Sequence, residues 1–147
     1  MNLVENKKAY FNYEILEKLE AGIELLGFEV KSLRKGQGSL DGSHVTIHNN
    51  ETYLINATVS PYQPANTPKD YEPRRNRKLL LTKKEISQLI GTEKQKGLTI
   101  VPLAIYSKGP KLKVSLGIVR GKKKFDKRQS IKKRESERDS RRILKYE

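Results

Sequence analysis

Apolar and polar residues alternate along the clearest elements of this chain, and a period of two residues predicts strands with one buried face. In residues 111–119 one face is apolar, and the other presents Lys111 and Lys113. Residues 98–106 predict the strand that comes before it. Pro102 lies within that strand and has no backbone N–H to donate, so we expect a sheet edge or a bulge there.

A hairpin is predicted by residues 45–48 and 53–59, which are rich in β-branched and aromatic residues. Asn49 and Asn50 lie between the two strands, and asparagine tolerates the positive φ of a tight hairpin turn. Residues 60–73 hold four prolines without any periodicity, which predicts a long loop.

Residues 13–26 fit two patterns. Their leucines, glutamates and lysines favour a helix, and a helical stripe fits through Ile15, Leu19, Ile23 and Leu26. As a strand, the segment has one face that is apolar except for Glu17, made of Tyr13, Ile15, Leu19, Ala21, Ile23 and Leu25. On the residues alone the helix stays open, and the strand is the preferred interpretation.

Two helices are predicted. Residues 27–36 form a short one, which Gly36 can end in the left-handed conformation. Thr82 and Glu85 have the spacing of a capping box, and the helix that they begin is expected to run to about Gly97. Its buried face would hold Ile86, Leu89 and Ile90.

The order of these elements predicts a mainly β fold with flanking helices, a small antiparallel barrel. We expect the barrel over residues 13–119, after a basic N-terminal arm at residues 1–12 and before a basic tail at residues 120–147. In the arm, Tyr10 and Phe11 either pack on the barrel or offer rings for stacking on bases. The tail has few apolar residues, so we expect it to be disordered when free and to fold on a polyanion.

The charge of the chain indicates the kind of partner that it binds. The chain has 31 Lys and Arg against 17 Asp and Glu, a net charge of +14. Residues 120–147 have 13 against 5, a net of +8, so the tail carries more than half of it. This balance indicates a nucleic acid, since cations bind phosphates by releasing counterions.

Other partners and compartments are not indicated. No cysteine is present, which excludes disulfides and thiolate zinc sites. No apolar run approaches the roughly 20 residues of a membrane span, and the first residues have no apolar signal region. We therefore expect a cytoplasmic protein without a membrane partner.

No pattern typical of an enzyme appears, so we expect no catalysis, cofactor or metal. Residues 117–123 resemble a phosphate loop only superficially. Three residues separate the glycines where four are needed, and Lys123 stands where Ser or Thr would bind magnesium. His44 and His48 share a strand face but have no third ligand nearby.

The basic clusters are the candidate RNA contacts. Outside the tail they comprise Lys7, Lys8, Arg74, Arg77, Lys78, Lys111 and Lys113. An alternative for Arg74 and Arg77 is that they stabilise the long loop. In the tail, acidic residues precede arginines by three or four positions, as Glu137 precedes Arg141, which favours a helix when the tail folds.

Five stretches form a more specific pattern: EAGI at 20–23, EVKSLR at 29–34, PRRNRKLLL at 73–81, KGLTIVPL at 96–103 and GKKKFDKR at 121–128. In this order, and across the chain from about Asn6 to its end, they resemble the SmpB family of bacterial tmRNA-binding proteins, also called SsrA-binding proteins. The resemblance implies a barrel of the oligonucleotide-binding (OB) type, with residues 13–26 as a long strand.

The resemblance also implies a function. A protein of this family binds the tRNA-like part of tmRNA and, with elongation factor Tu and GTP, brings alanyl-tmRNA to 70S ribosomes that have stalled. It is a binding adaptor in trans-translation, and we expect a monomer. A ribosomal or initiation-factor-like RNA-binding barrel and a generic polyanion binder are the alternatives, which selective binding to tmRNA over ribosomal RNA would separate.

The residues that the resemblance assigns to tmRNA are Glu20, Leu80 and Lys113. Glu20 would act through hydrogen bonds or a basic neighbour, and Leu80 as a structural support. Phe125 stands where some relatives have histidine, so its role there would be stacking. In the tail, which would enter the decoding site and message channel of the ribosome, the resemblance assigns Asp126, Lys127, Arg128, Ile143 and Leu144. We expect Arg120, Lys122, Lys123 and Phe125 to contact the ribosome as well.

Overall fold

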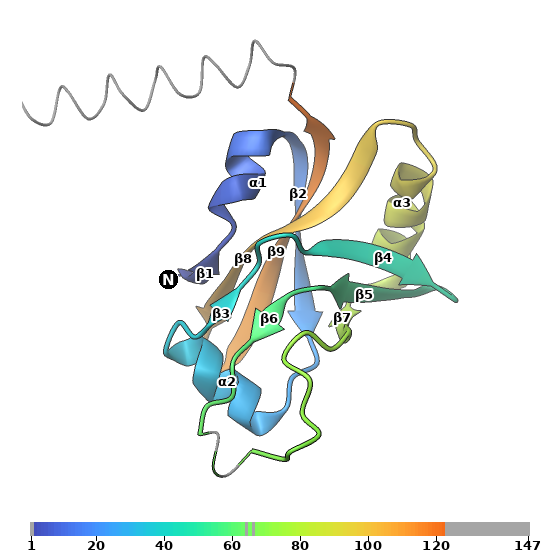
Figure 1. Cartoon of the computed structure of the whole chain (residues 1–147). Coiled ribbons are helices and arrows are strands. Elements are labelled where there is room, and N and C mark those ends of the chain that lie inside the picture. Colours follow the sequence, from blue (N-terminus) through green and yellow to red (C-terminus); the bar gives the residue numbers. More distant parts are fainter. Residues whose placement is uncertain (1, 64, 66, 123–147) are drawn as a thin grey trace, which may run out of the picture.

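The structure, a computed structural model, describes residues 2–63, 65 and 67–122 (Figure 1). Its helices are α1 (Lys7–Asn12), α2 (Gly27–Arg34) and α3 (Lys83–Glu93). Its strands are β1 (Asn2–Glu5), β2 (Tyr13–Ile23), β3 (Gly38–Ser39), β4 (His44–His48), β5 (Glu51–Ile55), β6 (Thr58–Val59), β7 (Arg77–Leu80), β8 (Leu98–Lys108) and β9 (Lys111–Gly121). The predicted mainly β fold with flanking helices is confirmed.

The strands of the described ranges form one large antiparallel sheet in the order β1-β8-β9-β2-β7-β5-β4, and β3 pairs with β6 separately. The sheet curls until β4 lies against β8, which makes a barrel. Inside it, apolar side chains from most strands are fully buried, and Leu33 of α2 and Leu89 of α3 join them. Burial of this apolar surface is the main term that stabilises the barrel.

Helix α1 covers one end of the outer face of β2, β9 and β8 (Figure 1). Beneath it lies a second apolar cluster of Ala9, Val101, Leu103 and Val119. Gly117 leaves room for this cluster, because a Cβ on it would lie 3.0 Å from Leu103 Cδ1. The predicted polar face of the last strand therefore ends at Ser115, and both faces of β9 are buried from Leu116 to Val119.

The prediction that the apolar residues of 13–26 share one face is wrong, although the strand is confirmed as β2. A β-bulge lies between Ile15 and Glu17 in the pairing with β9. One extra residue reverses the face that the following side chains occupy. Ile15 therefore packs on the outer cluster beneath α1, whereas Leu19 and Ala21 pack inside the barrel.

The predicted hairpin is confirmed, but its second strand is shorter than expected. Asn49 and Asn50 form the turn with φ of 51° and 60°. The strand expected over residues 53–59 is interrupted at Asn56, whose φ is 65°. This left-handed residue ends the pairing of β5 with β4, and the chain then continues as β6, which pairs with β3.

The capping box at the start of α3 is confirmed. Thr82 Oγ1 accepts a hydrogen bond from the Glu85 backbone N–H at 3.2 Å, and the Glu85 carboxylate accepts one from the Thr82 backbone N–H at 3.0 Å. The helix ends earlier than Gly97. Leu89 is buried as predicted, whereas the two isoleucines of α3 are only half-buried, so its apolar face is narrower than expected.

Residues 2–12, which lie in the expected arm, form β1 and α1. Asn6 joins them: its Oδ1 accepts a hydrogen bond from the Ala9 backbone N–H at 3.2 Å, and its Nδ2 donates to the Pro102 carbonyl at 2.8 Å. The bulge predicted at the proline is confirmed, between Pro102 and Ala104 in the pairing with β9. The buried Asn6 side chain therefore connects the N-terminal segment to the irregular part of β8.

No helix within the described ranges is long and apolar enough to cross a membrane. The expectations for most of the tail, namely its disorder when free and its folding on the ribosome, concern residues 123–147 and lie outside the described ranges. The division into arm, barrel and tail stays a prediction.

Candidate nucleic-acid interface

Beyond α1, the outer face of β2, β9 and β8 is open and polar. The register places Gly22 of β2 and Tyr106 of β8 on the two sides of Lys113, and Leu80 of β7 pairs with Gly22. We call this surface the lysine face and define it as Glu20, Leu80, Tyr106, Lys108, Lys111 and Lys113. It brings together four residues that the sequence analysis proposed as RNA contacts, namely Glu20, Leu80, Lys111 and Lys113.

Glu20 makes two contacts across the sheet. The Tyr106 hydroxyl donates a hydrogen bond to one carboxylate oxygen, and Lys108 Nζ donates to the other at 3.0 Å. The hydrogen bond from Tyr106 and then that from Lys108 lower the pKa of Glu20. Burial, followed by the hydrogen bond to Glu20, raises the pKa of Tyr106 to about 12. Glu20 is thus an anion that orients a tyrosine and a lysine.

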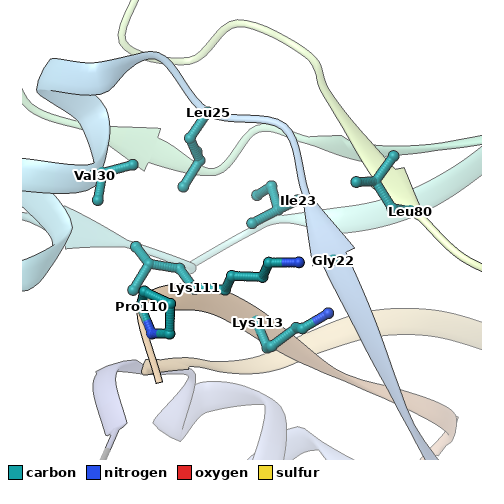
Figure 2. A pocket seen from close by; sticks show the side chains of 9 residues that line it. Gly22, Ile23, Leu25, Val30, Leu80, Pro110, Lys111 and Lys113 are labelled. Atoms are coloured by element: carbon teal, nitrogen blue, oxygen red, sulfur yellow. The ribbon is translucent and has the colours of Figure 1, made fainter. Parts of the chain in front are cut away.

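Lys111 and Lys113 differ from Lys108 because neither forms an ion pair with any residue in the part of the chain that the structure describes. Lys111 is exposed and Lys113 is half-buried. Figure 2 shows both side chains extending toward β2 at Gly22. Two cations on adjacent same-face positions of one strand, neither of them held in an ion pair, suit a phosphate backbone.

Leu80 is 49% exposed, although it is a large apolar residue. It lies directly on Gly22, where a Cβ would be 3.1 Å from Leu80 Cβ. The expected role as a structural support accounts for this contact with β2 but not for the exposed half. In the sheet, Gly22 alone separates Leu80 from Lys113 (Figure 2).

The structure contradicts the prediction that Arg77 contacts RNA. Its side chain is fully buried and cannot reach a phosphate. Its Nη2 forms an ion pair with Glu29 Oε2 at 2.6 Å. The other groups that accept hydrogen bonds from this guanidinium are the Tyr71 hydroxyl and the carbonyls of Ala57, Pro73 and Arg75. The alternative, in which Arg77 stabilises the long loop, is the one that the structure shows.

Glu29 of α2 is the centre of this buried network. Burial alone would raise its pKa, but hydrogen bonds from Arg75, the Leu26 backbone N–H, Arg77 and Tyr71 lower it to about 2. Burial and the hydrogen bond to Glu29 raise the pKa of Tyr71 to about 12. The charge of Glu29 therefore fixes the end of the long loop and the start of β7 against α2.

The remaining predicted cations are not part of the lysine face. Three of them form ion pairs: Lys8 with Asp41 at 3.6 Å, Lys78 with Glu51 at 3.3 Å and Arg120 with Glu14 at 2.6 Å. Lys7 and Arg74 are exposed. The backbone N–H of Lys122 donates to the Asn12 carbonyl at 3.0 Å. The rest of the proposed ribosome contacts, Lys123, Phe125, Asp126, Lys127, Arg128, Ile143 and Leu144, lie outside the described ranges.

Tyr106 and Lys108 were missed by the sequence analysis. Both lie at the end of β8, next to the turn at Gly109 that leads into β9. Antiparallel pairing across that turn already places Tyr106 opposite Lys113, and this register was the signal that could have found them. Among the described residues, no group of three or more His, Asp or Glu side chains is arranged to hold a metal ion.

Comparison with known proteins adds the family. The model of the SmpB protein family matches residues 3–146. Relatives named SsrA-binding protein are 50% identical in Microcystis aeruginosa, 51% in Magnetococcus marinus and 44% in Paraburkholderia xenovorans. These alignments cover 97%, 97% and 99% of this chain, and 93%, 95% and 98% of the relatives.

A solved structure gives the same result. A chain in "tmRNA-SmpB: a journey to the center of the bacterial ribosome" is 49% identical, with a TM-score of 0.69, over 82% of this chain and 84% of that chain. The resemblance noted in the sequence is therefore confirmed, over nearly the whole chain. The chain belongs to the SmpB family of SsrA-binding proteins.

Proposed function

We propose that this protein is a tmRNA-binding adaptor of trans-translation, which carries tmRNA to stalled ribosomes. The observation that carries the proposal is a pair of lysines, Lys111 and Lys113, that form no ion pair with the described residues and lie on an open sheet face. The relatives of this protein are named for SsrA binding. The solved relative described as tmRNA-SmpB, in the bacterial ribosome, supports the same partners.

The proposal also covers the binding partners of the protein and its cellular compartment. The protein binds the tRNA-like part of tmRNA as a monomer in the cytoplasm, and elongation factor Tu with GTP joins through the alanyl-tmRNA. It is a binding protein and performs no covalent chemistry. The lysine face contacts the RNA, with Glu20 orienting Tyr106 and Lys108 rather than contacting phosphate itself.

Lys113→Ala tests the lysine face. Loss of one phosphate contact should weaken tmRNA binding and reduce the slope of log K against log salt by about 0.7 to 0.9. The matched control is Lys84→Ala, an exposed lysine on α3 away from this face. Equal affinity and an unchanged salt slope in Lys113→Ala would show that the surface is assigned wrongly.

Selectivity tests the function itself. We expect the parent protein to bind tmRNA more tightly than an equal length of ribosomal RNA at moderate salt. A preference for ribosomal RNA would favour a ribosomal or initiation-factor-like barrel instead. Equal, salt-sensitive binding to both would indicate a generic polyanion binder.

The tail is assigned to a later step. Asp126, Lys127 and Arg128, with Ile143 and Leu144, act in the decoding site and message channel after tmRNA has bound. Replacing Ile143 and Leu144 by Asp should leave tmRNA affinity nearly unchanged but stop tagging on stalled ribosomes. Full tagging by this variant would reduce the tail to an electrostatic tether.

A further inference from the structure

A cavity of about 490 Å³ lies between helix α1, the turn that leads into β4 and the start of β8. Lys8, Ala9 and Asn12 line it from α1, and Thr99 and Val101 line it from β8. It shares no residue with the lysine face. Its volume lies within the roughly 300 to 1,000 Å³ of sites that hold a small ligand, so it has room for an aromatic ring.

The lining of this cavity has an apolar and a polar part. Ala9 and Val101 belong to the outer apolar cluster beneath α1, and Tyr13 packs against that cluster. Asn12 and Thr99 supply polar groups and are half-buried. An aromatic ring that entered the cavity would continue the outer cluster, and its burial would be a large favourable term.

The cavity presents no unpaired charge to an occupant. Of the described residues that line it, Lys8 is the only lysine, arginine, aspartate or glutamate. Lys8 forms an ion pair with Asp41 at 3.6 Å. The cavity differs in this from the lysine face, where two lysines have no ion pair with the described residues, so it favours a neutral occupant.

The chain leaves the barrel beside this cavity. β9 ends at Gly121, which pairs with Tyr13 (Figure 1). The backbone N–H of Lys122 donates a hydrogen bond to the Asn12 carbonyl at 3.0 Å, and both Tyr13 and Asn12 line the cavity. Phe125 follows three residues after Lys122 and is the first apolar residue of that stretch. Three extended residues span about 10 Å, so its ring is within reach.

We propose that the ring of Phe125 occupies this cavity in the free protein and holds the start of the tail against α1. The docking does not rest on the proposed function, because it concerns the protein before it meets any RNA. We then expect disorder in the free tail only after Phe125. If the tail acts in the ribosome as proposed, the ring has to leave the cavity first, so docking would hold the tail back until that step.

Two other occupants fit the cavity less well. A nucleotide would bring phosphates to a lining whose one lysine already has a carboxylate partner. A side chain of a separate peptide would match the lining but would lose translational freedom on binding. A ring tethered a few residues away has an effective concentration of about millimolar or more, which favours the segment of this chain.

NMR and fluorescence of the full-length protein test the docking. We expect nuclear Overhauser contacts between the ring protons of Phe125 and the methyl groups of Ala9 and Val101. Fluorescence gives a second measurement, because the chain has no tryptophan. Phe125→Trp should emit at shorter wavelength, and be quenched less by acrylamide, than the control Tyr146→Trp, which places the indole near the end of the tail.

Filling the cavity should release the ring. Thr99→Arg places a long cationic side chain there, and in the Phe125→Trp background it should shift the emission to longer wavelength and restore quenching. The matched control is Ser87→Arg, at an exposed position of α3 that is not part of the lining. Melting followed by circular dichroism shows whether each variant folds. If Thr99→Arg does not fold, the contacts of Phe125 in the parent protein decide.

The absence of those contacts, with equal quenching of Phe125→Trp and Tyr146→Trp, would overturn the inference. Equal effects of Thr99→Arg and Ser87→Arg on the emission would also overturn it. A short uridine strand that shifts the methyl signals of Val101, where Phe125 gives no contact, would identify a nucleotide as the occupant instead. The docking itself is measured without tmRNA, so its failure would leave the proposed function standing.

Discussion

Replacing the buried carboxylate of Glu29 by an amide should remove much of the stability of the barrel. In Glu29→Gln the shape is kept, but the guanidinium of Arg77, which is fully buried, loses its counter-charge. Breaking a buried ion pair from one side costs about 3 to 5 kcal/mol. Since whole domains are stable by only about 5 to 15 kcal/mol, this one atom exchange should cost a large share.

The lowered pKa of Glu29 corresponds to a similar free energy. Its value falls from an ordinary 4.5 to about 2 on folding, and each unit corresponds to about 1.4 kcal/mol, so the charge stabilises the fold by about 3 kcal/mol. Because the folded-state pKa is the lower one, this stability is fully present above about pH 4.5 and is lost as the pH falls toward 2. The variant should lack this part of the acid dependence.

Urea unfolding of parent and variant, followed by circular dichroism between pH 2 and pH 7, measures both effects. The matched control is Glu51→Gln, since Glu51 pairs with Lys78 at the surface, with 45% and 37% of the two side chains exposed. Exposed pairs of this kind contribute about 0 to 1 kcal/mol. If Glu29→Gln loses no more stability than Glu51→Gln at pH 7, the network around Arg77 does not hold the loop and β7 as described.

Three further outcomes are expected. Thr82→Ala should lower the free energy of unfolding by about 1 kcal/mol in urea titrations, through loss of the N-cap, and a cost near zero would contradict the capping box. Gly117→Ala should lower the melting temperature, because its Cβ would press on Leu103, and a melting temperature equal to that of the parent would show that the outer cluster yields easily. Tyr106→Phe should raise the pKa of Glu20 in an NMR titration, since the lost hydrogen bond is the main cause of its lowered value, and an unchanged pKa would refute that assignment.

Local chemistry made much of this fold predictable from sequence. Asn49 and Asn50 form the expected turn, and the Thr82 cap begins the expected helix, because each signal depends on a few adjacent residues. Alternation also predicted which face of residues 111–115 would be polar. These are features in which the local preference and the tertiary structure agree.

Features set by distant contacts could not be read in the same way. The bulge before Glu17 appeared in the sequence only as one charged residue on an apolar face, and its meaning depends on pairing with β9. Arg77 lies in a basic cluster of the sequence, as a phosphate contact would, but its partner Glu29 is 48 positions away. A cluster of cations in sequence therefore indicates charge, and only the fold decides which of them face solvent.

On the lysine face, too, some residues could be predicted from their own strand and others depend on distant contacts. Lys111 and Lys113 were predicted from their own strand, whereas Tyr106 and Lys108 needed the register of β8 against β9. Leu80 was expected to be a structural support among the residues that the resemblance assigns to tmRNA. Its exposure follows from a strand that ends there, on top of a glycine of the neighbouring strand.

The central position of β9 has a consequence for synthesis. β9 is the last strand of the chain but lies between β2 and β8 in the sheet. Glu14 and Arg120, which form an ion pair across β2 and β9, are 106 positions apart. At a synthesis rate of about 5 to 20 residues per second, roughly 5 to 20 s pass between the synthesis of β2 and that of its partner β9. During that time its backbone edge is open to other strands, so the nascent chain passes through its most aggregation-prone stage just before the last strand emerges.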